Sequence, residues 1–272
     1  MDTISEDTRR IEVAPGVRLA VKVGGTPGMP VLVFSNSLAA DMGSWDEVAE
    51  RLAPHARIVR YDTRGHGRSD VPGGPVILAD LGRDVLALLD ALGIGKAAVC
   101  GLSLGGMTGM WLAIHAPQRV AGLALANTAA SFPPPTLWRE RADAARASGS
   151  VAGFVEPTLG RWFTEGFRAT APDRVAAIGR AIAATPAAGY AAACEVLAGT
   201  DLLPELGRIA CPTLVIAGQH DPSSPPARGE EIVAAVPGAT LVTLDAAHLS
   251  AVEAPDAFAS HLIRFVSGLS ST

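Results

Sequence analysis

The feature that most constrains the fold of this chain is an apolar run that is followed by a glycine-flanked serine and then directly by a helical pattern. Residues 97–100 are apolar, residues 101–105 spell Gly-Leu-Ser-Leu-Gly, and residues 107–116 have a helical pattern. Glycine on either side of Ser103 removes the Cβ atoms that would clash in a tight turn. The order of strand, turn and helix predicts a nucleophile elbow, which holds the Ser103 hydroxyl at the end of a strand. The simpler alternative is an ordinary serine in a glycine-rich turn.

Short apolar runs alternate with helical patterns before and after this turn. Continuous apolar runs are typical of strands buried on both faces of a parallel sheet. The alternation therefore predicts an α/β fold with a mostly parallel, eight-stranded sheet and helices on both faces. The predicted strands are two antiparallel ones within residues 11–23, followed by 30–34, 57–61, 97–100, 120–126, 212–218 and 240–244. The predicted helices are 45–52, 78–92, 107–116, 227–236 and 255–266.

The alternation stops between residues 131 and 204. This stretch has no strand pattern, and it contains a proline run followed by helical segments rich in alanine and arginine. We interpret it as a helical cap inserted into one domain. Residues 1–130 and 205–272 then form the core, and residues 131–204 form the cap.

Composition limits the classes of protein to consider. A chain of 272 residues with 49% hydrophobic and 18% charged residues can bury a large core. The net charge of −5 and the lack of a basic stripe argue against nucleic acid as a partner. No apolar run approaches the ~20 residues of a membrane span, and residues 2–10 are too polar for a signal sequence. Three widely spaced cysteines predict a reduced, cytoplasmic chain without disulfides: Cys100, Cys194 and Cys211.

A serine hydroxyl becomes a useful nucleophile only beside a base that a third group orients. In open α/β sheets such groups lie just beyond the carboxyl ends of strands. The predicted strand 212–218 leads directly to Asp221, and the strand 240–244 leads to His248. Ser103, Asp221 and His248 are therefore the predicted nucleophile, acid and base.

Other acidic and histidine residues are weaker candidates for these roles. Asp245 also follows a strand, but it precedes His248 by only three residues, whereas Asp221 comes from a separate strand and can approach the imidazole from behind. The remaining histidines are expected to be solvated, packed or loop-bracing: His55, His66, His115, His220 and His261.

Acyl transfer also needs two N–H groups directed at the developing oxyanion. The backbone N–H of Leu104, directly after the serine, is one candidate. The loop after the strand 30–34 is expected to supply the other. Asn36 and Ser37 occupy the place in that loop where many hydrolases carry His-Gly, and this likeness implies the N–H of Leu38. No carboxylate and histidine cluster has metal-ligand spacing, and the glycine turn lacks the lysine of a nucleotide loop, so no metal and no cofactor are expected.

Several motifs together resemble one enzyme family along nearly the whole chain. They are Phe-Ser-Asn-Ser-Leu at 34–38, Arg-Tyr-Asp-Thr-Arg-Gly-His-Gly-Arg-Ser at 60–69, Cys-Gly-Leu-Ser-Leu-Gly-Gly at 100–106, Leu-Ala-Asn-Thr-Ala at 125–129, Gly-Tyr at 189–190 and Leu-Asp-Ala-Ala-His-Leu-Ser at 244–250. In these motifs the chain resembles the 3-oxoadipate enol-lactonases, a branch of the α/β-hydrolase superfamily. One departure is alanine at positions 39 and 40, where glycine and a polar residue are expected.

The resemblance implies an α/β-hydrolase fold with an inserted helical cap. It also implies hydrolysis of 3-oxoadipate enol-lactone to 3-oxoadipate, in the bacterial breakdown of protocatechuate and catechol. This substrate is a small anionic lactone, so its carboxylate needs a cation or N–H donors in the pocket. Arg139 and Arg161, each beside a tryptophan of the cap (Trp138 and Trp162), are the candidates for that contact.

Two other functions remain open from the sequence. One is a broader carboxylesterase or perhydrolase on the same scaffold. The other is a non-catalytic ligand receptor that keeps the fold, because fold alone does not determine function. Dehalogenases and epoxide hydrolases carry aspartate at the position of Ser103 and are disfavoured. The sequence predicts no oligomeric state and no stereochemical preference for the lactone.

Overall fold

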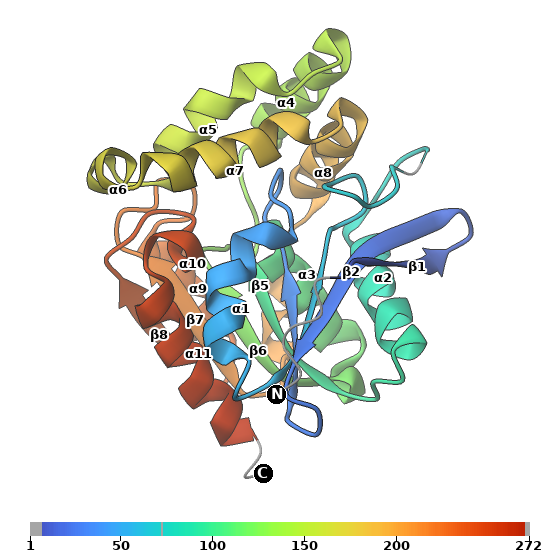
Figure 1. Cartoon of the computed structure of the whole chain (residues 1–272), viewed down its shortest axis with the longest axis vertical. Coiled ribbons are helices and arrows are strands. Elements are labelled where there is room, and N and C mark those ends of the chain that lie inside the picture. Colours follow the sequence, from blue (N-terminus) through green and yellow to red (C-terminus); the bar gives the residue numbers. More distant parts are fainter. Residues whose placement is uncertain (1–6, 72, 270–272) are drawn as a thin grey trace.

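Eight strands form a single sheet in the order β1-β2-β4-β3-β5-β6-β7-β8 (Figure 1). The computed structural model describes residues 7–71 and 73–269, so residues 2–6 of the polar N-terminal segment lie outside it. The strands from β3 to β8 pair in parallel, and β2 pairs antiparallel with both β1 and β4. The predicted mostly parallel, eight-stranded sheet is confirmed. The strands are β1 (Arg9–Ala14), β2 (Val17–Gly25), β3 (Val31–Ser35), β4 (Arg57–Tyr61), β5 (Ala97–Leu102), β6 (Val120–Ala126), β7 (Thr213–Gly218) and β8 (Thr240–Leu244).

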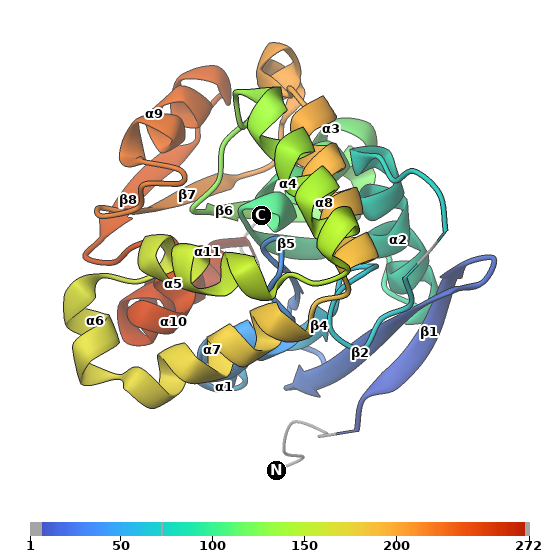
Figure 2. The same cartoon turned by 90° about the horizontal axis from the view of Figure 1, so that it is seen from above.

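Helices cover both faces of this sheet (Figures 1 and 2). The helices α1 and α11 pack together on one face, and α2 and α3 pack together on the other. The helices of these two layers are α1 (Asp46–Leu52), α2 (Leu78–Ala91), α3 (Leu104–His115), α9 (Pro226–Ala235), α10 (Ser250–Glu253) and α11 (Pro255–Leu269). The helix α3 begins earlier than the predicted residue 107, because the chain turns into it directly after Ser103.

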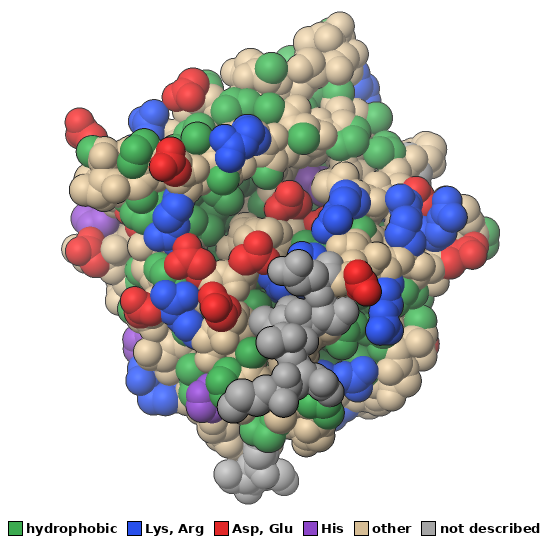
Figure 3. Space-filling view, viewed as in Figure 1, with side chains coloured by type: hydrophobic (Ala, Val, Ile, Leu, Met, Phe, Trp, Pro, Cys, Tyr) green, Lys and Arg blue, Asp and Glu red, His purple; other side chains and the backbone are tan. Residues whose placement is uncertain are grey.

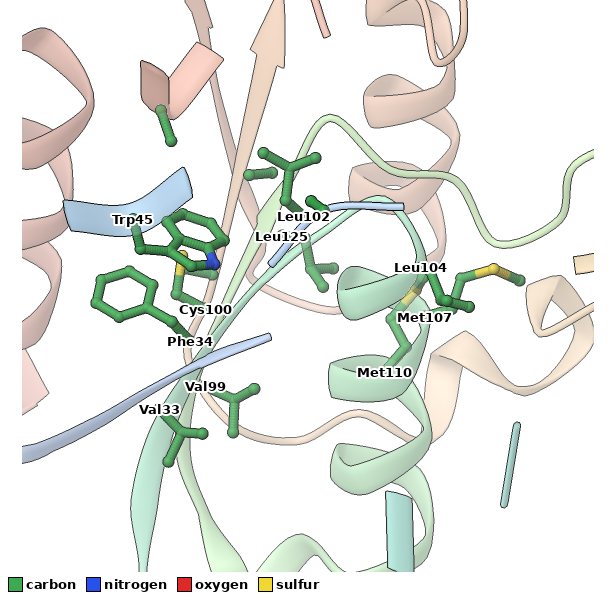
Figure 4. Packing of buried hydrophobic residues seen from close by; sticks show 14 of the residues in the cluster. Val33, Phe34, Trp45, Val99, Cys100, Leu102, Leu104, Met107, Met110 and Leu125 are labelled. Atoms are coloured by element: carbon green, nitrogen blue, oxygen red, sulfur yellow. The ribbon is translucent and has the colours of Figure 1, made fainter. Parts of the chain in front are cut away.

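The core lies between the central strands and the helices that flank them (Figure 4). Every residue of β5 is buried, as expected for a strand covered on both faces. On one face Phe34 packs against Trp45, with ring centroids 4.6 Å apart. On the other face Met107 and Met110 of α3 are fully buried. Burial of each such large side chain contributes about 1.5–3 kcal/mol to the free energy of folding. The elbow between β5 and α3 is therefore supported by a well-packed core.

A separate layer of helices lies above the carboxyl ends of the parallel strands (Figure 1). It occupies the stretch in which the sequence has no strand pattern. Its first and last helices pack side by side (Figure 2). The segments that lead into and out of the layer meet at a bridge between Ser131 and Asp201, next to a 2.9 Å hydrogen bond from Leu202 N to Ala130 O. The helices are α4 (Pro135–Ser148), α5 (Val155–Trp162), α6 (Glu165–Thr170), α7 (Pro172–Ala184) and α8 (Ala187–Gly199).

Within the described residues, no single helix has the length and apolar character needed to cross a membrane. The helices α7 and α8 meet that requirement only when taken together, and they are bent by 93° at their junction. Acidic and basic side chains are interspersed over the face of the molecule in Figure 3.

Candidate active site

Ser103 sits in a strained turn between β5 and α3. Its φ of 55° and ψ of −114° lie in a region that side-chain-bearing residues rarely adopt. A Cβ atom on Gly101 would lie 2.1 Å from the carbonyl oxygen of Gly105, and one on Gly105 would lie 2.1 Å from that of Ser35. Both glycines are therefore required for the turn to close. Backbone strain of this kind costs about 1–3 kcal/mol and clusters at functional sites.

Two hydrogen bonds join the strained turn to β6 and to the residues that follow it. The Ser103 N–H donates to Ala126 O at 3.0 Å, and the Thr128 hydroxyl donates to Ser103 O at 2.7 Å. Gly106 matters for the same contact, because a Cβ atom there would lie 2.7 Å from the Thr128 side chain. The end of β6 therefore fixes the backbone on which the serine hydroxyl is carried.

The structure brings Asp221 and His248 together beyond the ends of β7 and β8. The Nδ1 atom of His248 lies 2.8 Å from Oδ2 of Asp221, and both side chains are buried. His248 and Ser103 line the same cavity. Asp245, the weaker candidate for the acid, is highly exposed and lies 2.8 Å from Nε2 of His220. The geometry therefore favours Asp221 as the partner of His248.

Backbone and side-chain donors surround the carboxylate of Asp221. Oδ1 accepts hydrogen bonds from the N–H groups of Ser223 and Ser224, at 2.7 and 3.1 Å. Oδ2 accepts from the Ser224 hydroxyl at 2.6 Å and from Asn127 Nδ2 at 3.1 Å. Burial alone would raise the pKa of Asp221, but the facing charge of His248 and these hydrogen bonds hold it well below its ordinary value. Asp221 is therefore a carboxylate, which can stabilise a protonated imidazole at His248.

Sequence reasoning did not identify Asn127 or Ser224 as parts of this site. Asn127 follows β6 directly and has a φ of 43°, a conformation that asparagine tolerates better than most residues. Its amide also donates to Ala247 O at 3.1 Å, and its Oδ1 accepts from the Ser250 hydroxyl. The rule that found Asp221 and His248, a polar residue directly after a parallel strand, applies equally to Asn127.

The loop after β3 forms another wall of the cavity, which Ser37 and Leu38 line. Asn36 braces this loop, because its Nδ2 donates to Tyr61 O at 2.8 Å and its Oδ1 accepts from Trp45 Nε1 at 2.8 Å. Ala39 has a φ of 64°, which explains why glycine is the expected residue at that position. The N–H of Leu104, the first residue of α3, has no acceptor within the helix. The oxyanion roles of Leu38 and Leu104 stay predictions.

The cavity has a volume of about 370 Å³, within the range of small-molecule sites. Ser103 and His248 form its floor, and helices of the upper layer form its roof. The residues of the roof include Leu137, Trp138, Arg141, Thr158, Arg161, Trp162 and Tyr190. Among the described residues, no group of three or more His, Cys, Asp or Glu side chains could hold a metal ion.

Of the two arginines predicted to bind the substrate carboxylate, only Arg161 lines the cavity. Arg139 is exposed and lies away from it. Arg141 lines the cavity instead: it follows Trp138 by three positions and shares its helix face, whereas Arg139 lies about 100° further round the helix. That spacing is the signal that sequence reasoning missed. The guanidinium of Arg141 lies over the ring of Trp138, 5.2 Å from its centroid.

Arg141 and Arg161 make the roof of the cavity positively charged. Neither forms a salt bridge with an aspartate or glutamate in the described part of the chain. Within residues 7–71 and 73–269, Arg161 Nη2 donates a single long hydrogen bond of 3.3 Å, to the Thr158 hydroxyl. Burial and the neighbouring charge of Arg141 lower the pKa of Arg161. Two unpaired cations in a cavity attract an anionic ligand.

His66 is buried in the loop after β4 and is expected to make stability depend on pH. Its Nδ1 lies 3.1 Å from Arg64 O, its Nε2 has no hydrogen-bond partner, and burial lowers its pKa from 6.5 to about 4. Between these two values the unfolded chain binds a proton that the folded chain does not, so stability falls as the pH drops. The contribution reaches about 3 kcal/mol.

Urea unfolding of the wild type and of His66→Gln at pH 7 and pH 4.5 measures this contribution. The wild type is expected to lose more of its free energy of unfolding on acidification than the variant, because glutamine does not titrate. Equal losses in the two proteins would show that His66 does not cause the pH dependence.

Comparison with known proteins identifies the class to which this fold and site belong. A family model described as the alpha/beta hydrolase fold matches residues 30–255. The chain belongs to the α/β-hydrolase family. Within that family it is 41% identical over 253 residues to 3-oxoadipate enol-lactonase 2 of Acinetobacter baylyi. The aligned residues cover 93% of this chain and 94% of the relative.

Two solved structures agree with this relationship. The crystal structure of the enol-lactonase from Burkholderia xenovorans superposes with a TM-score of 0.92 and 39% identity, covering 95% of this chain and 100% of that one. A hydrolase from Pseudomonas aeruginosa gives a TM-score of 0.93 and 42% identity, covering 96% and 99% of the two chains. The resemblance to enol-lactonases that the motifs indicated is confirmed.

Proposed function

We propose that this protein hydrolyses 3-oxoadipate enol-lactone to 3-oxoadipate in the breakdown of protocatechuate and catechol. The observation that carries the proposal is the pair of unpaired arginines above Ser103 and His248. A cavity of this kind suits a small acyl substrate that also carries a free carboxylate. The enol-lactonases to which the chain is similar are named for such a substrate.

The proposed reaction begins at the lactone carbonyl. The Ser103 oxygen attacks the carbonyl carbon while His248 accepts the serine proton, and Asp221 stabilises the resulting imidazolium. The N–H groups of Leu38 and Leu104 bind the oxyanion. The ring C–O bond then breaks, and the His248 imidazolium gives its proton to the departing enolate, which is a better leaving group than an alkoxide and leaves the imidazole neutral again. Its ketonisation makes this step effectively irreversible.

Water completes the proposed cycle. His248 accepts a proton from a water molecule, whose oxygen attacks the acyl-enzyme formed on Ser103. The acyl C–O bond to the serine breaks, the serine recovers its proton, and the second carboxylate of the product appears beside the nucleophile. No cofactor takes part in either half of the reaction.

Residues 131–204 act in this proposal as a cap that supplies the substrate contacts. The carboxylate of the lactone binds the guanidinium groups of Arg141 and Arg161, and the rings of Trp138 and Trp162 form apolar walls beside the lactone. Arg139 has no part in binding, because it is exposed. Charge-assisted hydrogen bonds of this type are worth about 1.5–3 kcal/mol each.

Removing either guanidinium is expected to weaken recognition of the lactone but not of a substrate that lacks a carboxylate. Arg141→Met and Arg161→Met should each lower kcat/KM for the lactone by about 10- to 100-fold, mostly through KM. Hydrolysis of p-nitrophenyl acetate, which carries no carboxylate, should change less than twofold. The matched control is Arg139→Met, which should leave both activities unchanged. Equal losses on both substrates would contradict a role in carboxylate binding.

A steady-state comparison of the enol-lactone with p-nitrophenyl acetate tests the proposed function itself. We expect kcat/KM to favour the lactone by at least about 100-fold, because only the lactone contacts both arginines. Comparable rates on the two substrates would support the broader carboxylesterase or perhydrolase. Lactone binding without turnover of either substrate would support the receptor.

We propose a cytoplasmic location for this enzyme. The three cysteines support it, because all are free and Cys100 and Cys194 are buried without partners for a disulfide. Burial raises the pKa of the Cys194 thiol to about 12, which disfavours the thiolate form.

A further inference from the structure

The residue that precedes His248 is held at both of its backbone polar groups. Ala247 N donates to Glu253 Oε2 at 2.8 Å, and Ala247 O accepts from Asn127 Nδ2 at 3.1 Å. The Ala247 carbonyl belongs to the peptide bond that leads into His248. Rotation of this peptide would break the hydrogen bond to Asn127, and rotation of the preceding one would break the hydrogen bond to Glu253. Two side chains therefore fix the backbone on which the imidazole is carried.

The same glutamate reaches the helical layer that roofs the cavity. Oε1 of Glu253 accepts a hydrogen bond from Thr164 N at 3.2 Å and a second one from the Thr164 hydroxyl. Thr164 is the N-cap of α6 and accepts from Phe167 N at 3.2 Å. One carboxylate thus joins the loop of the predicted base to the segment between α5 and α6.

A backbone hydrogen bond and a ring contact strengthen this junction. Leu249 N donates to Trp162 O at 3.0 Å, so the residues on both sides of His248 bind to fixed partners. The ring centroid of Trp162 lies 6.0 Å from that of His248. Because Trp162 lines the cavity, the position of the cavity wall and the position of the imidazole are set by the same short segment, residues 162–164.

We propose that Glu253 is a positioning residue for His248. Its carboxylate fixes the position of the imidazole relative to the cavity wall. The chemistry requires a carboxylate. An ionised carboxylate accepts hydrogen bonds on both oxygens, whereas the NH2 group of an amide would face a donor at either Thr164 or Ala247. The proposal rests on the proposed function only in taking His248 as the base, which lactone and aryl ester hydrolysis share.

Glu253→Gln tests the proposal with a nearly isosteric change. We expect kcat to fall about tenfold on both the enol-lactone and p-nitrophenyl acetate, because a small displacement of the base slows each acyl transfer. KM for the lactone should change less than twofold, because the arginines stay in place. Rates are normalised to the folded fraction measured by circular dichroism. The matched control is Glu47→Gln, which removes a surface carboxylate paired with Arg51 and Arg174 and should leave kcat unchanged.

Thr164→Val provides a second variant in case Glu253→Gln does not fold. It removes the hydroxyl donor but keeps the Thr164 backbone N–H, so a smaller fall in kcat, about two- to fivefold, is expected on both substrates. An unchanged kcat on p-nitrophenyl acetate, or a loss confined to KM of the lactone, would overturn the proposal. If the wild type hydrolyses only the aryl ester, the proposed substrate is wrong, and the effect of Glu253→Gln on kcat for that ester still decides the role of Glu253.

Discussion

Ser103→Ala is expected to lower kcat on the enol-lactone by a factor of about 10³ to 10⁶. The hydroxyl is the only group of the elbow that can form the acyl-enzyme, and alanine removes it without adding volume. The strained backbone at φ 55° is equally accessible to alanine and serine, so the fold should persist. Lactone binding, which the proposed function assigns to Arg141 and Arg161, should stay within about threefold of the wild type.

Single-turnover and steady-state kinetics separate these effects. The wild type should form an acyl-enzyme that mass spectrometry detects after mixing with p-nitrophenyl acetate, and the variant should form none. Retention of more than a tenth of the wild-type kcat by Ser103→Ala would show that another group attacks the carbonyl.

Asp221→Asn is expected to lower kcat by a factor of about 10³ to 10⁴ while preserving the fold, although the hydrogen bond from Asn127 Nδ2 is lost. The side-chain oxygen of asparagine can still accept from the N–H groups of Ser223 and Ser224. Its NH2 group then faces Nδ1 of His248 as a donor, which leaves the ring proton on Nε2. A neutral imidazole in that tautomer cannot accept the proton of Ser103.

Asp245→Asn is the matched control for this prediction. Asp245 also follows β8 and also lies near a histidine, but its partner is the exposed His220. Steady-state assays should show less than a twofold change in kcat for this variant. If Asp245→Asn caused the larger loss, the acid would have been assigned to the wrong strand.

The fold and the two residues at the ends of β7 and β8 could be predicted because their signals are local. A continuous apolar run specifies a buried parallel strand, and the residue that follows it must lie at the carboxyl edge of the sheet. The elbow is equally local, since Gly101 and Gly105 are required by backbone contacts of 2.1 Å. Asp221 and His248 therefore meet in the structure although the sequence alone shows no contact between them.

The residues that line the roof of the cavity were predicted less accurately. Arg139 was expected among them, but it faces solvent. Adjacency to Trp138 in the sequence does not mean a shared face, because successive residues of a helix point about 100° apart. The face of α4 that turns inward is set by packing of its buried alanines, Ala142 and Ala145, in the layer it forms with α8. That packing orients Arg141 toward the cavity and Arg139 toward solvent.

By itself, the sequence determined the parallel sheet, the strained serine turn and the strand ends from which Asp221 and His248 project. These follow from steric limits on φ and ψ and from hydrophobic periodicity, both of which act within a few residues. Only the tertiary structure decided which polar groups support them. Asn127 and Asp221 are 94 positions apart, and Glu253 and Thr164 are 89 positions apart. Hydrogen bonds between such residues depend on contacts near 3 Å, which the packing of distant elements creates and no local pattern encodes.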